Sequence, residues 1–360
     1  MMSQISYEQI VPFGIAAMLD SATGLTREDK DELRRLYWRD GLLLVRGLKL
    51  SMEEQLEFCS IFGPVLRGAH DKYLVSNVAK DGLLGDLELL FHHDVPYVPA
   101  PFLAGALHAL EVSEGVSGTR FASGLRAYER LPQQLRDRID GLNALFVRPR
   151  NEDRRNKLTD SIPGDNCAVH AVVPRQAGTG RPYIFLNGQS TASIIGLPET
   201  QSDALISELL SYVYADDNVY EHKWKNGDLV IWDNLALQHA RAKITGGVRT
   251  LQRVTIARFG YEEQYPADCA WFGDLQEDRG FGARDNTALP AAYLRLQNSS
   301  PGECKANPQT RQTPRTRIDV IEARRAIGNL RGYRPACHWI SLNASAMRFG
   351  AAGRAYIRSR

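Results

Sequence analysis

Short apolar runs, each bounded by glycine, proline or polar residues, dominate the centre of the chain. Strands are predicted at residues 41–47, 102–111, 181–187, 229–232 and 250–259, because each apolar run has about the length of a strand and is short for a buried helix. A core rich in β-sheet is therefore expected from the pattern alone.

Amphipathic segments on either side of these runs predict helices. Thr26 and Ser51 are each followed three positions later by an acidic residue, which is the pattern of a capping box at a helix N-terminus. A Leu-Pro step divides the helical pattern of residues 123–142, because proline interrupts the backbone hydrogen bonds of a helix. The predicted helices cover residues 26–38, 51–62, 123–142 and 201–214.

Together these elements predict a mainly β fold with flanking helices. The best fit is a β-sandwich of the jelly-roll kind, in other words a double-stranded β-helix core. Such a sandwich brings together strands that are far apart in the sequence. Residues 149–166 form a long polar stretch, which we interpret as a loop and a candidate lid; an ordinary surface loop is the alternative.

Candidate metal ligands stand at the end of one short apolar run, in the sequence Phe-His-His-Asp that ends at Asp94. His92 and Asp94 are two positions apart, so on a β-strand both side chains point to the same face. His239 is a third candidate, which a jelly roll can bring alongside. Two histidines and one carboxylate form the facial triad of non-haem Fe(II) oxygenases, which leaves metal positions open for a co-substrate and O₂.

Composition and charge narrow the class of protein. With 43% hydrophobic and 24% charged residues, the chain has the make-up of a globular protein with a core of ordinary size. A net charge of +2 is too small to predict binding to nucleic acid or to a membrane. No uncharged apolar run approaches the ~20 residues of a membrane span. Five cysteines without a CxxC pair, and a first segment unlike a signal peptide, indicate reduced thiols and a cytoplasmic protein.

The last part of the chain differs from the rest in charge. Residues 301–360 carry twelve basic and three acidic residues, a net +9, which leaves −7 of the total +2 for residues 1–300. We therefore divide the chain into a catalytic domain over residues 1–300 and a basic C-terminal extension over residues 301–360. A solvated extension is the ordinary interpretation, and an arm that contacts an acidic partner or another subunit is the functional one.

The motifs and their order make the chain similar to the TauD/TfdA family of Fe(II)/2-oxoglutarate-dependent dioxygenases. His92 and Asp94 correspond to the His-x-Asp motif of the family, and an aromatic residue precedes them. Trp232 begins the Trp-Asp-Asn segment that the family places before its second histidine, which is His239 here. The resemblance covers residues 35–262 and implies that these two histidines and the aspartate bind iron.

The resemblance also implies roles for residues around the metal motif. Thr119, 27 positions after His92, and Arg253 would bind the distal carboxylate of 2-oxoglutarate, although the glycines that precede this threonine in the family are replaced here. Arg249 stands where family members often touch an anionic substrate. His70 and Tyr73 precede the metal motif and are further candidates for substrate binding, with a polar loop as the ordinary alternative.

The activity that the resemblance implies needs Fe(II), with 2-oxoglutarate and O₂ as co-substrates. Such an enzyme hydroxylates or desaturates an unactivated C–H bond of a small molecule, here an anionic or amino-acid-like one, and converts 2-oxoglutarate to succinate and CO₂. Related halogenases lack the metal-binding carboxylate. Because Asp94 is present, hydroxylation or desaturation is expected instead of halogenation.

Three alternatives stay open at this point. A zinc-type hydrolase could use the same triad to activate water, but it has no need of Arg253 and Thr119. A non-catalytic protein that binds a metal or a partner is the second alternative. The third keeps the oxygenase chemistry but acts on a substrate tethered to an acidic carrier protein in natural-product biosynthesis, which the basic extension would attract. Family members often self-associate, so the resemblance also makes a homo-oligomer an expectation.

Overall fold

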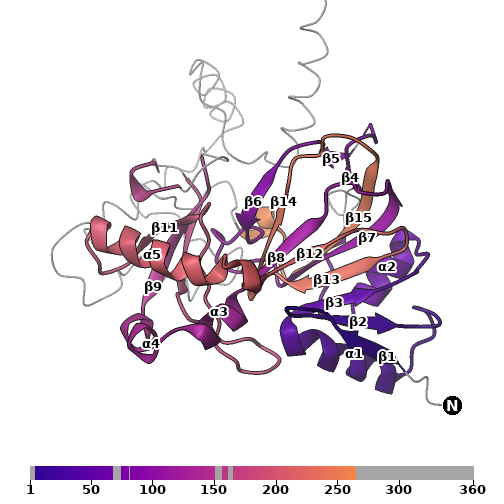
Figure 1. The fold of residues 1–360 in the computed structure, drawn as a ribbon, viewed down its shortest axis with the longest axis horizontal. Coiled ribbons are helices and arrows are strands. Elements are labelled where there is room, and N and C mark those ends of the chain that lie inside the picture. Colours follow the sequence, from indigo (N-terminus) through magenta and orange to yellow (C-terminus); the bar gives the residue numbers. More distant parts are fainter. Residues whose placement is uncertain (1–4, 68–73, 81, 151–155, 161–164, 265–360) are drawn as a thin grey trace, which may run out of the picture.

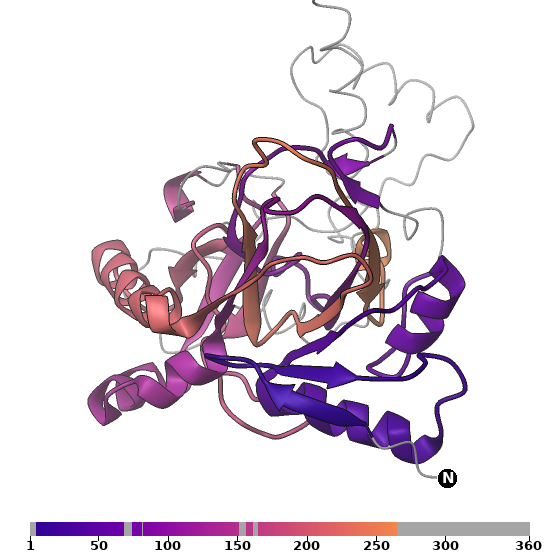
Figure 2. The same ribbon diagram turned by 45° about the vertical axis from the view of Figure 1, so that its right-hand side comes forward.

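Two β-sheets face each other and form the core of the molecule. In the computed structural model of the 360-residue chain, the described residues are 5–67, 74–80, 82–150, 156–160 and 165–264. Figure 2 shows the two sheets curving around a common interior, with helices outside them. The predicted mainly β fold with flanking helices is confirmed.

The larger sheet has eight strands, and most neighbours in it are distant in the sequence. All of its pairs are antiparallel except β2–β3 and β4–β5. Its order is β1 (Ser6–Gln9), β2 (Ile15–Met18), β3 (Leu42–Val45), β13 (Leu229–Asp233), β7 (Ala104–Val112), β15 (Arg249–Ile256), β4 (Leu74–Ser76) and β5 (Leu83–Leu84).

The smaller sheet has four antiparallel strands, and a third sheet of three strands lies apart from the first two. The order in the smaller sheet is β12 (Val219–His222), β8 (Thr119–Ser123), β14 (Leu237–Arg241) and β6 (Leu89–His92). The third sheet has the order β10 (Cys167–Ala171), β9 (Asn143–Val147) and β11 (Thr191–Ile194). The pairing of β6 with β14 joins segments that are about 150 positions apart, as a jelly roll does.

Apolar side chains from both main sheets fill the space between them. Trp232, Leu107 and Leu251 of the larger sheet belong to one cluster with Phe121 and Leu237 of the smaller sheet. All five are more than nine-tenths buried. Removing this much apolar surface from water is the main driving force that holds two sheets together.

Helices cover the outer face of the larger sheet. Leu33 and Leu36 of α1 (Arg27–Asp40) and Phe58 of α2 (Met52–Cys59) pack in one buried cluster with Val254 and Ile256 of β15. Both predicted capping boxes are present, so the N-terminal N–H groups of these helices have side-chain acceptors. Figure 1 shows α1 beneath the β1–β3 end of the sheet.

A second group of helices packs around the third sheet. The predicted helix of residues 123–142 is divided at its proline into α3 (Gly124–Arg130) and α4 (Gln133–Ile139). These helices share an apolar cluster with α5 (Glu199–Val213). The short elements are η1 (Leu158–Asp160), η2 (Asp216–Asn218) and α6 (Tyr261–Gln264).

The predicted strand over residues 181–187 is wrong. Tyr183 to Leu186 are buried, as the apolar run suggested, but they belong to no sheet. Their backbone bonds go to different neighbours: the N–H of Ile184 donates to Gly124, and the N–H of Phe185 donates to Val172. A segment that divides its hydrogen bonds in this way is extended and buried without forming a ladder.

Several predicted segments lie wholly or partly outside the described residues. The extension over residues 301–360 lies outside them, and so do His70 and Tyr73 and much of the polar stretch of residues 149–166. Within that stretch, Arg150 forms an ion pair with Asp165, whose side chain is buried. Across the described part of the chain, no helix has both the length and the apolar character needed to cross a membrane.

Candidate metal centre and active site

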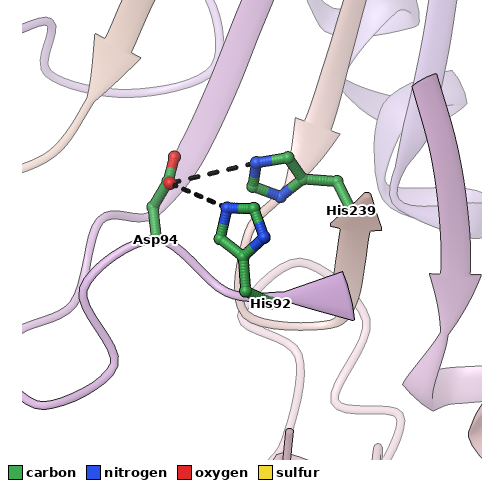
Figure 3. A group of neighbouring side chains, drawn as sticks. All are labelled: His92, Asp94 and His239. Carbon is green, nitrogen blue, oxygen red and sulfur yellow. Dashed lines mark ion pairs between the residues drawn. The ribbon is translucent and has the colours of Figure 1, made fainter. Parts of the chain in front are cut away.

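The pairing of β6 with β14 brings the two candidate histidines together. His239 stands opposite His92 in the sheet, and the centroids of their rings are 4.2 Å apart. The register then shifts, because β6 has one residue more than β14 between this pair and the next pair, Leu89 and Arg241. Bulges of this kind often re-aim side chains beside active sites. Figure 3 shows both rings turned toward the carboxylate of Asp94.

The three side chains converge on one point. Nε2 of His92 lies 3.7 Å and Nε2 of His239 lies 3.9 Å from the same carboxylate oxygen, Oδ1 of Asp94. All three ligand atoms lie within 4.8 Å of one another. Two ligand atoms that each bind one metal ion at about 2.0–2.2 Å are at most about 4.4 Å apart. The two measured distances therefore fit a single ion.

A hydrogen bond fixes the tautomer of His92. Nδ1 of this ring lies 2.7 Å from the carbonyl oxygen of Leu90, and because a carbonyl can only accept, Nδ1 carries the proton. In the neutral form of the ring, Nε2 is the nitrogen without a proton, and its lone pair is available to a metal. A hydrogen-bond partner on the far nitrogen is the usual support of a metal-binding histidine.

Asp94 does not lie on a strand, which corrects the prediction that it shares a strand face with His92. β6 ends at His92. Beyond the strand, the side chain of Asn234 replaces the ladder and bonds to the backbone of Asp94. Its Oδ1 accepts from the N–H of Asp94 at 2.7 Å, and its Nδ2 donates to the carbonyl of Asp94 at 3.1 Å. The next residue, Val95, has a φ of 44°, which a β-branched residue rarely adopts. The backbone therefore turns sharply after Asp94, and the two hydrogen bonds from Asn234 hold Asp94 in place before this turn.

Burial and neighbouring charges keep the triad ready to bind a metal. Burial would raise the pKa of Asp94, but Arg253 and the neighbouring histidines outweigh it and bring this pKa down to about 2. Burial, and after it the neighbouring His92, lowers the pKa of His239 well below its ordinary value. At neutral pH Asp94 is ionised and His239 is neutral, which are the forms that ligate.

Arg249 and Thr119 form a second, buried polar cluster. Arg249 is only 2% exposed, its Nη2 donates to Oγ1 of Thr119 at 3.0 Å, and its Nε donates to the carbonyl of Ser117 at 3.1 Å. The indole N–H of Trp224 donates to the same hydroxyl at 3.0 Å. Since the hydroxyl oxygen of Thr119 already accepts two hydrogen bonds, its own proton is left to donate to a further group.

Arg249 has no acidic neighbour in the described part of the chain. None of the ion pairs there involves it, and its Nη1 is buried without a hydrogen-bond partner. Burial, and after it the charge of Arg241, lowers the pKa of Arg249 to about 9. A buried cation without a counter-ion is costly, so this cluster is suited to an anion.

Arg253 stands at the metal and not with Thr119. Its Nη2 donates to Oδ2 of Asp94 at 2.7 Å, while Oδ1 of the same carboxylate faces the histidines. The two residues that were expected to bind one carboxylate are thus separated, since Thr119 pairs with Arg249. Arg249 and Arg253 are four positions apart on β15, which is about 13 Å along a strand.

One pocket joins the two clusters. Its metal end consists of His92, Asp94, His239 and Arg253, and its buried end contains Thr119 and Arg249, with Trp224 behind them. Between the two ends the wall is apolar, with side chains from the larger sheet and from β6. The apolar residues of this wall include Val75, Leu83, Leu84, Leu89 and Leu107.

Sequence reasoning missed three residues of this site. It included Asn234 only as part of the Trp-Asp-Asn segment, whereas the side chain of this residue holds the backbone of Asp94, which is 140 positions away. It gave Trp224 and Arg241 no role. Only the residue type of Asn234 hinted at its role, because an amide can donate to and accept from one backbone at the same time. His70 and Tyr73 lie outside the described residues and stay predictions.

Comparison with known families identifies the class of enzyme. The family model described as taurine catabolism dioxygenase TauD, TfdA family, matches residues 7–255, which is more than half of the chain. The chain belongs to this family. The resemblance that the motifs indicated is confirmed, and the oxygenase class stands in preference to the hydrolase and the non-catalytic binding protein.

Two relatives illustrate the range of reactions around this dioxygenase. The alpha-ketoglutarate-dependent 2,4-dichlorophenoxyacetate dioxygenase of Cupriavidus pinatubonensis is 27% identical over 266 residues, which cover 66% of this chain and 91% of that protein. Pentalenolactone F synthase of Streptomyces arenae is 29% identical over 246 residues, which cover 61% of this chain and 82% of that protein. Both match most of the relative's length.

Solved structures share the fold. The structure of AAD-2 in complex with Mn(II) and N-oxalylglycine has a TM-score of 0.59 at 20% identity and covers 71% of this chain and 98% of that one. A taurine dioxygenase from Burkholderia xenovorans has a TM-score of 0.58 at 21% identity, covering 70% of this chain and 89% of that one. The predicted jelly roll is confirmed by these likenesses.

The residues of the metal end fit the cofactor of the family. Two neutral imidazoles and one carboxylate are the ligand set of non-haem Fe(II) oxygenases, and all three donor atoms face one point here. This enzyme is an Fe(II)/2-oxoglutarate-dependent dioxygenase that uses O₂. The uncompensated Arg249 at the buried end is the kind of group that a dicarboxylate co-substrate needs.

Proposed function

We propose that this dioxygenase hydroxylates or desaturates an unactivated C–H bond of a small anionic substrate that has an apolar body. The observation that carries the proposal is a single pocket with the metal ligands at one end, the Arg249–Thr119 pair at the other and apolar side chains between them. Mostly apolar pockets with a few placed polar groups are the usual sites for small organic molecules.

Arg249 and Thr119 bind the distal carboxylate of 2-oxoglutarate in this proposal. That assignment exchanges the roles that the sequence pattern suggested for Arg249 and Arg253. The Nη1 of Arg249 and the hydroxyl proton of Thr119 both lack an acceptor among the described residues, and a carboxylate has two oxygens to offer them. The same carboxylate supplies the counter-charge that the buried guanidinium lacks.

Arg253 binds a metal ligand and can also bind an anionic group of the substrate in this proposal. Only its Nη2 is hydrogen-bonded to a described residue, and that bond orients the carboxylate of Asp94. Its other donors are available to an anionic group of the substrate, for which a planar guanidinium is well suited. An anion bound there keeps the apolar body of the substrate beside the metal.

The chain's own residues bind, orient and exclude water. When bound, iron(II), 2-oxoglutarate and O₂ supply the oxidising chemistry, and 2-oxoglutarate is converted to succinate and CO₂. The apolar wall keeps water away from the reacting carbon. Asn234 and the Leu90 carbonyl hold two of the ligands in position. Because Asp94 retains its place as a ligand, we propose hydroxylation or desaturation and not halogenation.

The names of relatives support an anionic substrate. One relative is named for 2,4-dichlorophenoxyacetate and another, from Sphingobium herbicidovorans, for (S)-phenoxypropionate. Both compounds are carboxylates with an aromatic body. A third relative, from Acinetobacter baylyi, is named an alkylsulfatase. An anionic head on an apolar body is the shared chemistry, and it matches a pocket with arginine at the metal end and leucine along the wall.

Succinate formation with a panel of compounds tests the proposal. The panel contains aryloxyacetates, straight-chain alkanoates, alkyl sulfates and amino acids, each incubated with enzyme, Fe(II), ascorbate and 2-oxoglutarate. Neutral esters and alcohols of matched size are the controls. Acids with an apolar body should increase succinate formation above the level without substrate. Equal stimulation by the neutral analogues would contradict an anionic substrate.

Anaerobic titration tests the site without any substrate. Apo-enzyme with Fe(II) and 2-oxoglutarate should show a weak visible charge-transfer band, which the His239→Ala variant lacks. Well-folded, metal-loaded wild type without a band would contradict the co-substrate assignment. The carrier-protein alternative depends on residues 301–360, which lie outside the described residues, and it stays a prediction together with self-association and the cytoplasmic location.

A further inference from the structure

The guanidinium of Arg241 binds a turn in a neighbouring segment of the same chain. The turn joins β5 to β6, and in it the N–H of Leu87 donates to the carbonyl of Leu84 at 3.0 Å. Nη2 of Arg241 donates to the carbonyls of Leu84 at 3.2 Å, Gly85 at 3.1 Å and Leu87, and its Nε also donates to Leu87. One buried side chain therefore binds three of the four carbonyls of this turn.

The same turn carries part of the pocket wall. Leu83 and Leu84 stand just before its bend and Leu89 just after it, and all three side chains line the pocket. Leu84 has a φ of 66°, in the left-handed region that leucine rarely adopts. A backbone held in such a conformation needs contacts that over-determine it, and the guanidinium of Arg241 supplies them.

Partly exposed leucines on this wall indicate which kind of ligand binds against it. Leu83, Leu84 and Leu89 are each only partly buried although they face the pocket of a folded enzyme. The free energy falls when an apolar ligand covers apolar surface of this kind and removes it from water. Arg241 also lines the pocket and comes from β14, two positions after the metal ligand His239, so it links the wall to the metal end.

We propose that Arg241 is a positioning residue that determines substrate specificity, because it holds the Leu84–Leu87 turn so that Leu83, Leu84 and Leu89 form the wall for the apolar part of the substrate. The inference rests on the proposed function, since it takes the occupant of the pocket to be a small substrate with an apolar body. It assigns the hydrocarbon part of that substrate to the β5–β6 side of the pocket.

Hydrogen exchange of the full-length enzyme tests the holding role without any substrate. In Arg241→Gln, peptides that cover residues 83–89 should exchange about tenfold faster than in wild type, because the turn loses most of its side-chain support. Peptides from β8 and β13 should not change. The control is Leu87→Ser, which alters an exposed side chain of the same turn and leaves its carbonyl free to accept. Unchanged exchange at residues 83–89 in Arg241→Gln would overturn the proposal.

Kinetics test the specificity role. The acid of the panel that gives the most succinate with wild type is compared with homologues shortened by one carbon at a time. Arg241→Gln should raise KM about tenfold for the most apolar acid, leave kcat and the 2-oxoglutarate titration close to wild type, and reduce the preference for longer homologues. Leu89→Ala should raise the same KM without faster exchange of the turn, because it changes only the wall.

The other outcomes separate the possible errors. If kcat, KM and 2-oxoglutarate binding all worsen together in Arg241→Gln, the residue is merely structural, and the specificity role is wrong. If 2-oxoglutarate binding alone weakens, Arg241 acts on the buried end through Arg249, and the specificity role is again wrong. If no acid of the panel stimulates wild type, the proposed function fails, while the exchange experiment still decides whether Arg241 holds the turn.

Discussion

The two ends of the pocket use the same type of side chain in opposite electrostatic settings. At the metal end, Arg253 is partly exposed and donates to the carboxylate of Asp94. At the buried end, Arg249 is 2% exposed and has a hydroxyl, a carbonyl and an indole as neighbours, with no acid among the described residues. Among the described residues, the first guanidinium has an anionic partner and the second has none.

This difference shows that the partners of an arginine, more than its place on a strand, define what it can bind. Arg249 and Arg253 both line the pocket from β15. A pKa of about 9 still leaves Arg249 charged at neutral pH, so a bound carboxylate gains a charge-assisted interaction in a buried setting. The same carboxylate at Arg253 would have to share the guanidinium with Asp94.

Removing one metal ligand while the buried end stays intact should cause the largest loss of activity. In His239→Ala, succinate formation should fall to background, because one of three protein ligands is lost. Under anaerobic conditions, Fe(II) at about a hundred times its dissociation constant should stabilise wild type by roughly 2.7 kcal/mol and the variant hardly at all. Thermal unfolding with and without Fe(II) measures this, with Lys243→Ala, an exposed change beyond β14, as the control. Equal stabilisation of His239→Ala would show that the triad is not the metal site.

Replacing Arg249 and Arg253 one at a time should give the next largest loss of activity. Arg249→Met should weaken 2-oxoglutarate binding roughly 30- to 4,000-fold, because loss of one partner of a buried charge pair costs about 2–5 kcal/mol. Arg253→Met should change that affinity less than about tenfold and raise KM for the acid substrate instead. Titration of the visible band measures the first quantity and succinate formation the second. The reverse pattern would restore the assignment that the sequence pattern suggested.

The sequence predicted which three side chains meet at the metal end, because their signal is a pattern of residue types. His92, Asp94 and His239 are chemically distinctive, and their order along the chain matches that of the family. The capping boxes at Thr26 and Ser51 were predictable for a similar reason, since they are local in sequence. Predictions of this kind need no knowledge of which strands are neighbours.

The rest depended on neighbours that the sequence does not reveal. The assignment of Arg249 and Arg253 turned on which of them lies next to Thr119, and that is decided by the packing of β8 against β15. The side chain of Asn234 bonds to a backbone 140 positions away, and adjacent residues in the sequence give no sign of that partner. Residues 181–187 were predicted as a strand because an apolar run records burial but not the partner of each N–H group.

Loosening Asp94 without removing it should have a smaller effect than either change above. Asn234→Ala removes both hydrogen bonds to the backbone of Asp94, and loss of such supporting partners typically lowers metal affinity about 10- to 100-fold. Competition for Fe(II) between enzyme and a chelator measures the change. Asn234→Asp keeps an acceptor for the N–H of Asp94 but loses the donor, so it should fall between wild type and Asn234→Ala. Unchanged affinity in both variants would limit Asn234 to a role in folding.

Acid should destabilise the structure behind the metal end. His170 donates from Nε2 to the carbonyls of Pro96 at 2.9 Å or Val98 at 3.1 Å, just after the loop that carries Asp94. Its ring contacts Phe185, which also contacts the ring of His93. Burial lowers the pKa of His170 to about 4, although these carbonyls act in the opposite direction.

The sign of this effect follows from the protons bound in each state. The unfolded chain protonates His170 near pH 6.5 and the folded chain only near pH 4, so the unfolded state binds more protons between these values. Stability should therefore fall with decreasing pH in this window, by about 1.4 kcal/mol per pH unit from this group. Urea unfolding of the metal-free enzyme at several pH values measures the slope. His170→Gln keeps a donor for the carbonyls but cannot take up a proton, so its slope should be smaller by that amount. Identical slopes would mean that the folded chain protonates His170 as readily as the unfolded chain does.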